Sequence, residues 1–571
     1  MKELELYNLW LEKATEDEDL IKELKSIEGN EAEIKDRFFK GLEFGTAGLR
    51  GVIGAGTFRL NIYTIRRATQ GLADYVNGAY ENASVAIAYD SRIKSDVFAR
   101  EAARVLAGNG IKVYIYKELM PTPMLSWAVR HLKCQAGIVC TASHNPAKYN
   151  GYKAYGDDGC QMTSESADVV LEKINAVEMF GGAKLVDFAE GLKSGIIEYI
   201  DDAVIEAYLD EVQKCQVHPE ICAESGLKVV YTPLNGTGNK PVRAIWDRIG
   251  IKDVTIVAEQ ELPDGNFPTC PFPNPEITEA LHLGLELCKK VKPDILVATD
   301  PDADRMGIAV PDKNGEFVLF SGNEVGAMLL EYICHERLAL GTMPKNPVAV
   351  KSLVSTDIAN KIAAEYGVEL RDVLTGFKYI GEQIGLLEEA NEMERFIFGF
   401  EESYGYLAGP YVRDKDAVVA SMLVCEMAAF YRSKGISMVE AREAMYEKYG
   451  NYCHTVESFV CEGISGMEEM ARLMARLHSE PMAEICGFKV TKTADYLKST
   501  ITEANGAVTP INLPKSDVIS YYLENDALVI VRPSGTEPKI KTYYTTVAPT
   551  KAQAVEAGKN IAENFKKVLG F

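Results

Sequence analysis

Several features that would place this sequence of 571 residues in a common class are missing from it. Its twelve cysteines include no Cys-x-x-Cys pair, which argues against structural zinc or a disulfide framework and indicates buried thiols. No run approaches the ~18 apolar residues of a membrane span. The first residues, Met1 to Glu5, lack the basic and apolar regions of a signal peptide. We therefore expect a cytoplasmic protein with no membrane partner.

The sequence also contains fewer positively than negatively charged residues. Lys and Arg number 61 against 83 Asp and Glu, which gives a net charge of −22. A charge of this sign repels nucleic acid and anionic lipid at long range, so nucleic acid is not an expected partner. A small phosphate ester would have to be held by isolated Arg and Lys residues in glycine-rich or strand-end loops.

The length of the sequence and its alternation of strand-like and helix-like segments are informative. Single hydrophobic cores stop growing at roughly 250 to 300 residues, so several domains are predicted. Residues 1–40 are rich in Glu, Lys and Leu at helical spacing and predict an N-terminal helical extension. After it, β-branched runs alternate with amphipathic stretches, which is typical of α/β architecture with largely parallel strands. The predicted strands are Val85–Tyr89, Val113–Tyr116, Gly137–Cys140, Val229–Tyr231, Val254–Val257, Ile295–Ala298, Val348–Val350, Val368–Leu370, Phe396–Phe398 and Leu528–Val531.

These strands form three similar units of three, followed by one strand near the C-terminus. In each unit the third strand runs directly into a loop of polar and charged residues, and the C-terminal strand does the same. Ligands of open α/β sheets gather outside the carboxyl ends of the strands. We therefore expect the four loops to converge on a single cleft between domains.

The first loop runs from Thr141 to Pro146 and holds a serine beside an imidazole, Ser143 and His144. This combination suits a nucleophile with a nearby proton carrier. The alternative is a turn from strand to helix, in which Ser143 or Asn145 only caps the helix. Lys153, ten residues further on, adds a cation or proton carrier, although a lone lysine is more often a solvated surface residue.

The second loop places three carboxylates at alternate positions after an apolar strand, Asp300, Asp302 and Asp304. Such a hard, oxygen-rich set suits magnesium. An EF-hand is excluded, because Arg305 stands where glycine is required and Pro311 where glutamate is required. A chance acidic turn is the remaining alternative.

The third and fourth loops carry groups that bind sugars and phosphates. Residues 399–405 offer carboxylates and a hydroxyl that can hydrogen-bond sugar hydroxyls, although two acidic residues before a glycine also occur at solvated helix starts. Residues 532–539 combine one guanidinium, one ammonium, two hydroxyls and a glycine, which is the composition of a phosphate cradle. A plain exposed turn would use the same Pro, Ser and Gly.

In this order and at these separations the four loops resemble the α-D-phosphohexomutase family, from about Gly41 to Phe571. The segment Phe44–Gly51 and the Ser-Tyr-Gly at 403–405 are most similar to bacterial phosphoglucomutases of the phosphoglucomutase-2 and phosphopentomutase branch; mannose-preferring relatives usually carry Ser-Gly-His there. The resemblance implies three similar mixed α/β domains and a smaller C-terminal α+β domain around a central cleft. The expected domains are 41–205, 206–322, 323–450 and 451–571, with the last swinging over the cleft.

The resemblance also implies roles for individual residues. Ser143 would be phosphorylated in the resting enzyme, and the three aspartates would bind Mg²⁺ together with one phosphoserine oxygen. Arg50, His144 and Lys153 would surround the transferring group. The residues that the resemblance assigns to substrate binding are Arg305, Thr375, Gly376, Lys378, Glu401, Ser403, Lys415, Arg532, Ser534, Gly535 and Thr536. Pro301 departs from the glycine of many relatives, which removes an N–H but no carboxylate.

The implied reaction interconverts glucose 1-phosphate and glucose 6-phosphate. It would pass through a sugar 1,6-bisphosphate that turns around in the site, with glucose 1,6-bisphosphate as activator. A mutase of pentose or mannose phosphates is the alternative within the family. A magnesium-dependent sugar phosphatase would need a water in place of the second hydroxyl, and a non-catalytic sugar-phosphate sensor would lose the nucleophile or the metal ligands. Small sugar phosphates are the expected partners, and monomer and homodimer both stay open.

Overall fold

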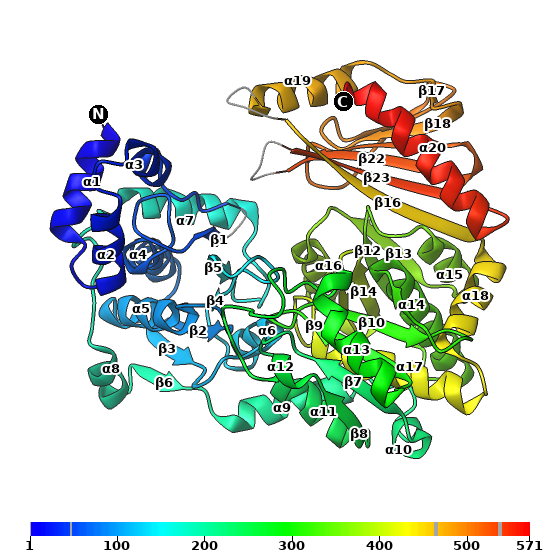
Figure 1. Ribbon diagram of the computed structural model, residues 1–571, viewed down its shortest axis with the longest axis horizontal. Coiled ribbons are helices and arrows are strands. Elements are labelled where there is room, and N and C mark those ends of the chain that lie inside the picture. The colour runs from blue at the N-terminus through cyan, green and yellow to red at the C-terminus, as the bar shows by residue number, and fades with distance from the viewer. Residues whose placement is uncertain (1, 46–47, 462–465, 535–538) are drawn as a thin grey trace.

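The computed structural model of the chain describes residues 2–45, 48–461, 466–534 and 539–571 (Figure 1). These residues form four β-sheets, of six, five, four and eight strands. The sheets follow one another along the chain, so each one defines a unit, and we call them the first to the fourth unit. All ten predicted strands are present among them.

The N-terminal extension is helical, as predicted, and consists of α1 (Lys2–Lys13), α2 (Glu18–Ser26) and α3 (Glu31–Phe38). The side chains of Asp17 and Asn30 accept hydrogen bonds from the first turns of α2 and α3, which explains why one helix does not continue through both positions. Trp10 is buried and makes edge contacts with Tyr63 and Phe180 of the first unit. The extension therefore packs onto that unit.

The first unit is a mixed sheet in the order β1-β5-β4-β2-β3-β6. Its strands are β1 (Gly48–Val52), β2 (Ser84–Tyr89), β3 (Lys112–Ile115), β4 (Ala136–Cys140), β5 (Tyr149–Tyr155) and β6 (Ile197–Tyr199). Its helices are α4 (Ile62–Ala79), α5 (Ser95–Gly108), α6 (Thr122–His131), α7 (Ser164–Ala176) and α8 (Phe188–Ser194), and α9 (Asp202–Gln213) leads onward. Every residue of β4 is buried, as in a strand covered on both faces, whereas β1 and β5 run antiparallel at one edge.

The second unit has the order β11-β10-β9-β7-β8. Its elements are α10 (Ile221–Ser225), β7 (Lys228–Thr232), α11 (Asn239–Arg248), β8 (Asp253–Ile256), α12 (Ala258–Glu261), η1 (Thr278–Leu281), α13 (His282–Val291), β9 (Ile295–Thr299), β10 (Met306–Pro311) and β11 (Phe317–Phe320). Strands β7, β8 and β9 are parallel, and β10 and β11 return antiparallel.

The third unit has the order β13-β12-β14-β15. Its elements are α14 (Gly322–Ala339), β12 (Val348–Ser352), α15 (Ile358–Tyr366), β13 (Glu369–Val373), α16 (Phe377–Glu389), η2 (Met393–Arg395), β14 (Phe396–Glu401), β15 (Gly405–Leu407), α17 (Ala417–Ser433) and α18 (Met438–Tyr449). Residues 417–429 of α17 are all buried, because the helix lies between units. Trp246 of the second unit donates its Nε1 hydrogen to the carbonyl of Ser421 on this helix, at 3.1 Å.

The fourth unit is an antiparallel sheet with two long helices, seen at the upper right of Figure 1. Its elements are β16 (Asn451–Val460), α19 (Gly466–Ser479), β17 (Glu484–Ile485), β18 (Phe488–Asp495), β19 (Thr500–Glu503), β20 (Val508–Pro510), β21 (Ile519–Leu523), η3 (Glu524–Asp526), β22 (Leu528–Pro533), β23 (Lys539–Ala548) and α20 (Lys551–Leu569). Leu353 and Leu374 of the third unit pack into the same apolar cluster as Ile530 and Tyr543 of the fourth.

The expected fold, three mixed α/β units followed by an α+β unit, is thus confirmed. The antiparallel edge strands make the three sheets less parallel than the alternating pattern alone predicted. In the part of the chain that the structure describes, no helix has both the length and the apolar character needed to cross a membrane.

Candidate active site

The serine loop joins β4 to the antiparallel strand β5, so Ser143 caps no helix and the alternative of a strand-to-helix turn is wrong. Ser143 has a φ of 52°, a left-handed conformation that is disfavoured for a residue with a side chain. Its amide donates to Thr141 Oγ1 at 2.8 Å. Its hydroxyl donates to Asp300 Oδ2 of the second unit at 2.8 Å and lies 3.1 Å from His144 Nδ1. The predicted nucleophile and the acidic loop therefore meet.

Cationic side chains of the first and second units act on the residues of the serine and acidic loops. Lys153 Nζ, on β5, lies 3.2 Å from Asp302 Oδ2, so Lys153 is not a solvated surface lysine. Arg50 stands on β1 opposite Gly151 of β5. Burial lowers the pKa of His144 well below its usual value, and the positive charges of Arg305 and Arg50 lower it further. His144 is therefore neutral at pH 7.

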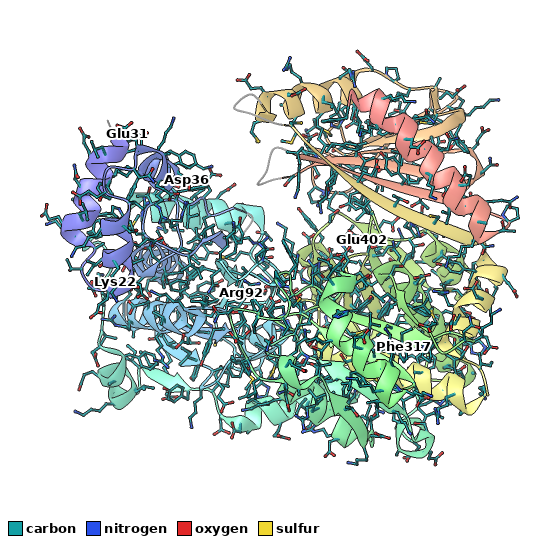
Figure 2. All side chains as sticks on the ribbon, in the orientation of Figure 1. Lys22, Glu31, Asp36, Arg92, Phe317 and Glu402 are labelled. Carbon is teal, nitrogen blue, oxygen red and sulfur yellow. The ribbon has the colours of Figure 1, made fainter. Side chains whose placement is uncertain are left out.

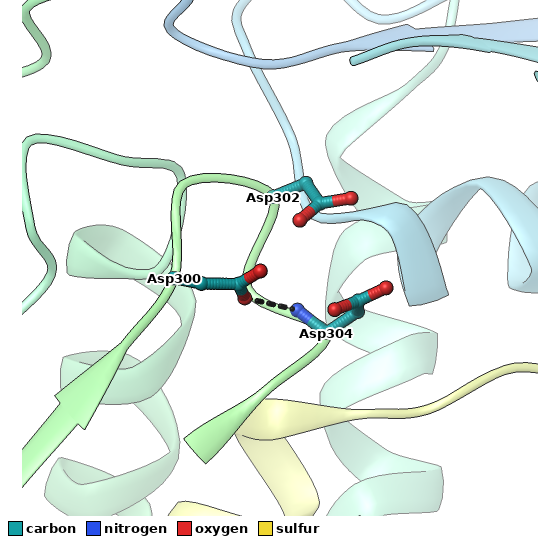
Figure 3. A group of neighbouring side chains, drawn as sticks. All are labelled: Asp300, Asp302 and Asp304. Atoms are coloured by element: carbon teal, nitrogen blue, oxygen red, sulfur yellow. Dashed lines mark hydrogen bonds between the residues drawn. The ribbon is translucent and has the colours of Figure 1, made fainter. Parts of the chain in front are cut away.

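The acidic loop connects β9 to β10 and brings Asp300, Asp302 and Asp304 together (Figure 3). One carboxylate oxygen from each lies within 4.8 Å of the others, and all three residues are buried. Asp300 Oδ1 accepts hydrogen bonds from the amides of Asp304 and Arg305, at 3.1 and 2.9 Å. Asp302 Oδ1 and Asp304 Oδ1 accept none from any described residue.

This chemistry fits a divalent cation. Buried carboxylates are costly unless they are paired or bind a metal. Burial, and then repulsion from Asp302, raises the pKa of both Asp300 and Asp304. Burial is also the largest single influence on Asp302, but Lys153, a hydrogen bond with Asp300, Lys415 and Thr122 together outweigh it and lower the pKa of that residue. Two buried oxygens still lack a donor, and a hard cation with oxygen ligands would satisfy them.

A neighbouring turn holds the acidic loop in place from within the second unit. The amide of Thr237 donates to the carbonyl of Pro301 at 2.8 Å. Gly236 lies so close that a Cβ there would be 2.5 Å from Pro301 Cα. Only glycine at position 236 lets the backbone of residue 301 come this close.

The loop predicted to bind sugar lies against the acidic loop. The amide of Met306 donates to the carbonyl of Tyr404 at 3.0 Å, and Arg305 and Gly405 form an isolated bridge. Lys415 crosses over Gly405, where a Cβ would be 2.2 Å from its Cδ, and its Nζ lies 3.0 Å from Asp304 Oδ2. The glycine of the Ser-Tyr-Gly sequence is therefore needed for this lysine to reach the aspartate.

The other predicted residues of the third unit lie around Glu401. Glu401 ends β14, and its Oε1 accepts a hydrogen bond from the amide of Gly376 at 2.9 Å. Thr375 Oγ1 is buried without a hydrogen-bond partner among the described residues, and Ser403 is partly exposed on the turn after β14. Lys378, in the first turn of α16, has its carbonyl 3.4 Å from Cys160 Sγ of the first unit.

The predicted phosphate cradle is described only in part, because Gly535 and Thr536 lie outside the described residues. Arg532 stands at the end of β22, and its Nε is buried without a hydrogen-bond partner in the described ranges. Its positive charge acts on Glu402: burial and Glu401 raise the pKa of Glu402 to about 7, and Arg532 opposes this shift. Ser534 donates its amide to the carbonyl of Lys539 at 2.8 Å.

Sequence reasoning missed two residues that contact the site. Thr122, at the start of α6, donates its Oγ1 hydrogen to Asp302 Oδ2 at 2.9 Å. Arg92, labelled in Figure 2, donates its Nε hydrogen to the carbonyl of Ser143 at 3.1 Å. The sequence could have indicated Arg92, because the polar residues 90–92 directly follow the buried strand β2, as the predicted loops follow their strands. No such signal pointed to Thr122.

Four family models match the chain in succession. Their descriptions are phosphoglucomutase/phosphomannomutase α/β/α domain I at residues 41–179, domain II at 206–315, domain III at 321–449, and the C-terminal domain at 492–558. The chain belongs to the phosphoglucomutase/phosphomannomutase family. The resemblance to the α-D-phosphohexomutases, on the side of the bacterial phosphoglucomutases, is thereby confirmed.

Individual relatives agree with this assignment. A phosphoglucomutase of Staphylococcus saprophyticus is 37% identical over 539 residues, which cover 94% of this chain and 96% of that protein. One from Staphylococcus aureus is 37% identical over 543 residues, or 95% of each chain. Two solved structures share the fold: phosphoglucomutase (parafusin) from Paramecium in its open form, with TM-score 0.69, 17% identity and coverage of 93% and 96%, and a phosphoglucomutase/phosphomannomutase family protein from Burkholderia thailandensis, with TM-score 0.65, 18% identity and coverage of 92% and 96%.

Proposed function

We propose that this enzyme, an isomerase by its family, interconverts glucose 1-phosphate and glucose 6-phosphate with Ser143 as the phosphoryl carrier. The observation that carries the proposal is the 2.8 Å hydrogen bond from Ser143 Oγ to Asp300, inside a buried cluster of three carboxylates. The staphylococcal relatives named phosphoglucomutase support glucose as the sugar.

Asp300, Asp302 and Asp304 would hold Mg²⁺ together with an oxygen of the phosphorylated serine. The bound ion would neutralise charge on the phosphoryl group. Lys153 and Arg50 add positive charge on the side of the first unit, and Lys415 balances Asp304 on the side of the third.

In the first half of the cycle the 6-hydroxyl of glucose 1-phosphate attacks the phosphoryl group on Ser143. The new O6–P bond forms as the Oγ–P bond breaks, and the hydroxyl proton passes to Ser143 Oγ. His144 Nδ1, neutral and 3.1 Å from Oγ, can relay this proton. In the second half Oγ attacks the 1-phosphate of the bisphosphate, and the proton returns to O1.

Between the two halves the bisphosphate has to turn around, so the far end of the site must accept either phosphate. We assign that function to the loop of Arg532, Ser534, Gly535 and Thr536. Glu401 and Ser403 would hold the sugar hydroxyls, and Arg305, Thr375, Gly376 and Lys378 would complete the substrate site. The buried, unpartnered Nε of Arg532 supports this assignment.

The deciding experiment is intact mass spectrometry with peptide mapping. We expect a shift of ~80 Da, one phosphoryl group, on the peptide that contains Ser143. Ser143→Ala should be unphosphorylated and inactive even with glucose 1,6-bisphosphate, whereas Ser479→Ala, on the exposed end of α19, should behave as wild type. Interconversion at a normal rate by Ser143→Ala would rule out the phosphoserine mechanism.

The sugar is tested separately, by assaying glucose 1-phosphate, mannose 1-phosphate and ribose 1-phosphate side by side. Glucose 1-phosphate should give the highest kcat/KM. A higher value for ribose 1-phosphate would make the protein a phosphopentomutase with the same mechanism, and release of free phosphate faster than isomer formation would make it a phosphatase.

A further inference from the structure

We propose that Arg92 is a positioning residue for the nucleophile: its guanidinium fixes the backbone that presents Ser143, and Phe267 of the second unit closes over it. The proposal rests on the function assigned to Ser143 above and adds a residue to which that function gives no role. It starts from the contacts of one buried side chain (Figure 2).

All five N–H groups of the Arg92 guanidinium are used on the serine loop. Nε donates to the carbonyl of Ser143 at 3.1 Å, and Nη1 donates to the carbonyls of Pro146 and Tyr149, each at 3.0 Å. Nη2 donates to the carbonyls of Ser143 and Asn145. A planar fork with five donors can hold four carbonyls at once, and a lysine with three rotating donors cannot.

The serine loop needs such support because of its own geometry. Ser143 adopts a φ of 52°, and a disfavoured conformation persists only where its surroundings hold it. The loop between β4 and β5 lies outside any helix or strand, and no backbone amide of the described residues donates to the carbonyls of Ser143 and Asn145. Arg92 pairs the carbonyl of Ser143 itself, so the guanidinium acts on the residue that carries the nucleophile.

Arg92 is in turn held from within the first unit. Its Nε lies 3.5 Å from Asp90 Oδ2, and neither side chain is exposed. Asp90 Oδ1 accepts hydrogen bonds from the amide of Arg92 and from Ser95 Oγ, at 2.9 and 2.6 Å. The carboxylate therefore binds the backbone of Arg92 through Oδ1 and places the charge of Oδ2 beside the guanidinium, which is what an arginine that positions another group requires.

The second unit covers the guanidinium from the other side. The ring of Phe267 is buried, and its centroid lies 5.1 Å from Arg92 Cζ, within cation–π distance. Gly265 approaches the turn that carries Arg92 so closely that a Cβ would be 2.4 Å from the amide nitrogen of Ile93. Because the same unit supplies Asp300, both the hydroxyl and the backbone of Ser143 are positioned relative to the second unit.

The first test is Arg92→Lys, which keeps the charge and removes the fork. A displacement of the nucleophile by about 1 Å costs roughly a hundredfold in rate, so kcat should fall by about that factor. The KM for glucose 1-phosphate should change by less than about threefold, because the predicted sugar and phosphate loops do not contact Arg92 in the described residues. The rate at which glucose 1,6-bisphosphate phosphorylates Ser143 should fall in parallel with kcat.

The matched control is Arg66→Lys. Arg66 is also a buried arginine of the first unit, but it pairs with Glu16 and Glu101 and touches the N-terminal extension instead of the serine loop. It should lower the Tm and leave kcat within about twofold of wild type. Equal losses of kcat in the two variants would mean that any buried arginine of this unit has the same effect, and would overturn the proposal.

Two further measurements keep the test decisive if Arg92→Lys folds poorly. Adding millimolar methylguanidinium to Arg92→Ala should restore part of kcat without changing KM. Phe267→Leu keeps the arginine and should lower kcat by roughly threefold to thirtyfold, the upper value being that of a desolvated cation–π contact. Normal kcat in Phe267→Leu, or in a folded Arg92→Lys, overturns the proposal. Wild-type protein without phosphoserine overturns the proposed function instead.

Discussion

At the scale of single residues, the acidic cluster is the feature with the least favourable electrostatics. Asp300, Asp302 and Asp304 are all buried, and Lys153, Lys415 and Arg305 balance part of their charge from nearby. An ion that binds three carboxylates of the folded chain, and not the unfolded chain, must stabilise the fold. Stability and activity should therefore depend on the same cation.

Mg²⁺ at a hundred times its Kd should stabilise the wild type by about 2.7 kcal/mol. Asp302→Asn should weaken Mg²⁺ binding by more than about tenfold and remove most of this stabilisation along with activity, since one of three ligands loses its charge. Differential scanning fluorimetry with and without Mg²⁺ measures the effect. Asp312→Asn, in the turn between β10 and β11, serves as control. A wild-type Tm that does not change when Mg²⁺ is added would argue against the metal site.

Arg532 is the residue of the fourth unit on which phosphate binding should depend most. Arg532→Ala removes a charge-assisted phosphate contact of about 1.5 to 3 kcal/mol, so kcat/KM should fall about ten- to a hundredfold. Steady-state kinetics with glucose 1-phosphate measures this, with Arg472→Ala on the exposed face of α19 as control. If Arg532→Ala matches the control, the loop is only a turn.

At the scale of elements, α19 is joined to its sheet by apolar packing and by ion pairs of His478. His478 Nδ1 lies 3.0 Å from Asp495 Oδ1 of β18, and its Nε2 lies 2.8 Å from Asp517 Oδ1. The hydrogen bond to Asp517 raises the pKa of His478; burial opposes this shift and Asp495 adds to it. A raised pKa in the folded state means that protonation stabilises this attachment.

The stability that His478 gives should be fully present below about pH 6.5, its unfolded pKa, and should be lost as the pH rises through the raised folded pKa. Hydrogen exchange of the α19 amides, compared between wild type and His478→Gln at the same pH, measures it. The difference in protection should be large at pH 5.5 and small in alkaline solution. His282→Gln, exposed in the second unit, should show none. A difference that grows with pH would contradict this assignment.

The strands and the acidic loop were predictable because they rest on local signals. Strands β4, β9 and β14 are buried along their whole length and read as continuous apolar runs, and the Asp-x-Asp-x-Asp pattern follows one of them directly. The contacts of Arg92 were not predictable, because a guanidinium that binds carbonyls more than fifty residues away leaves no pattern in their side chains. The same holds for Gly405, whose need for space depends on Lys415.

At the scale of the whole molecule, the fourth unit contacts the third through an apolar cluster and through ion pairs. Leu353 and Leu374 belong to that cluster, and the ion pair between Lys361 and Asp526, at 3.3 Å, is largely exposed. Exposed ion pairs contribute little, so relative motion of the two units is the default expectation. The domain boundaries at 205, 322 and 450 stay a prediction.

If the fourth unit closes on substrate, small-angle scattering should show a lower radius of gyration with saturating glucose 1,6-bisphosphate, from a value near ~25 Å expected for a compact chain of this length. Arg532→Ala should not contract, because the phosphate that would draw the unit inward loses its main contact. Glucose without phosphate is the control ligand. No change in the wild type would mean that substrate binds without closure.

The placement of the tryptophans sets what can be observed when the protein unfolds. The three lie at positions 10, 127 and 246, so the last 325 residues contain none. Trp10 reports on the N-terminal extension, and Trp246, through its bond to Ser421, reports on the packing between the second and third units. Detachment or unfolding of the fourth unit would therefore not change tryptophan emission. Enzyme activity, which needs the Arg532 loop, would be lost in the same step. If the fourth unit unfolds first, the midpoint of activity loss should lie at a lower urea concentration than the midpoint of the tryptophan fluorescence change.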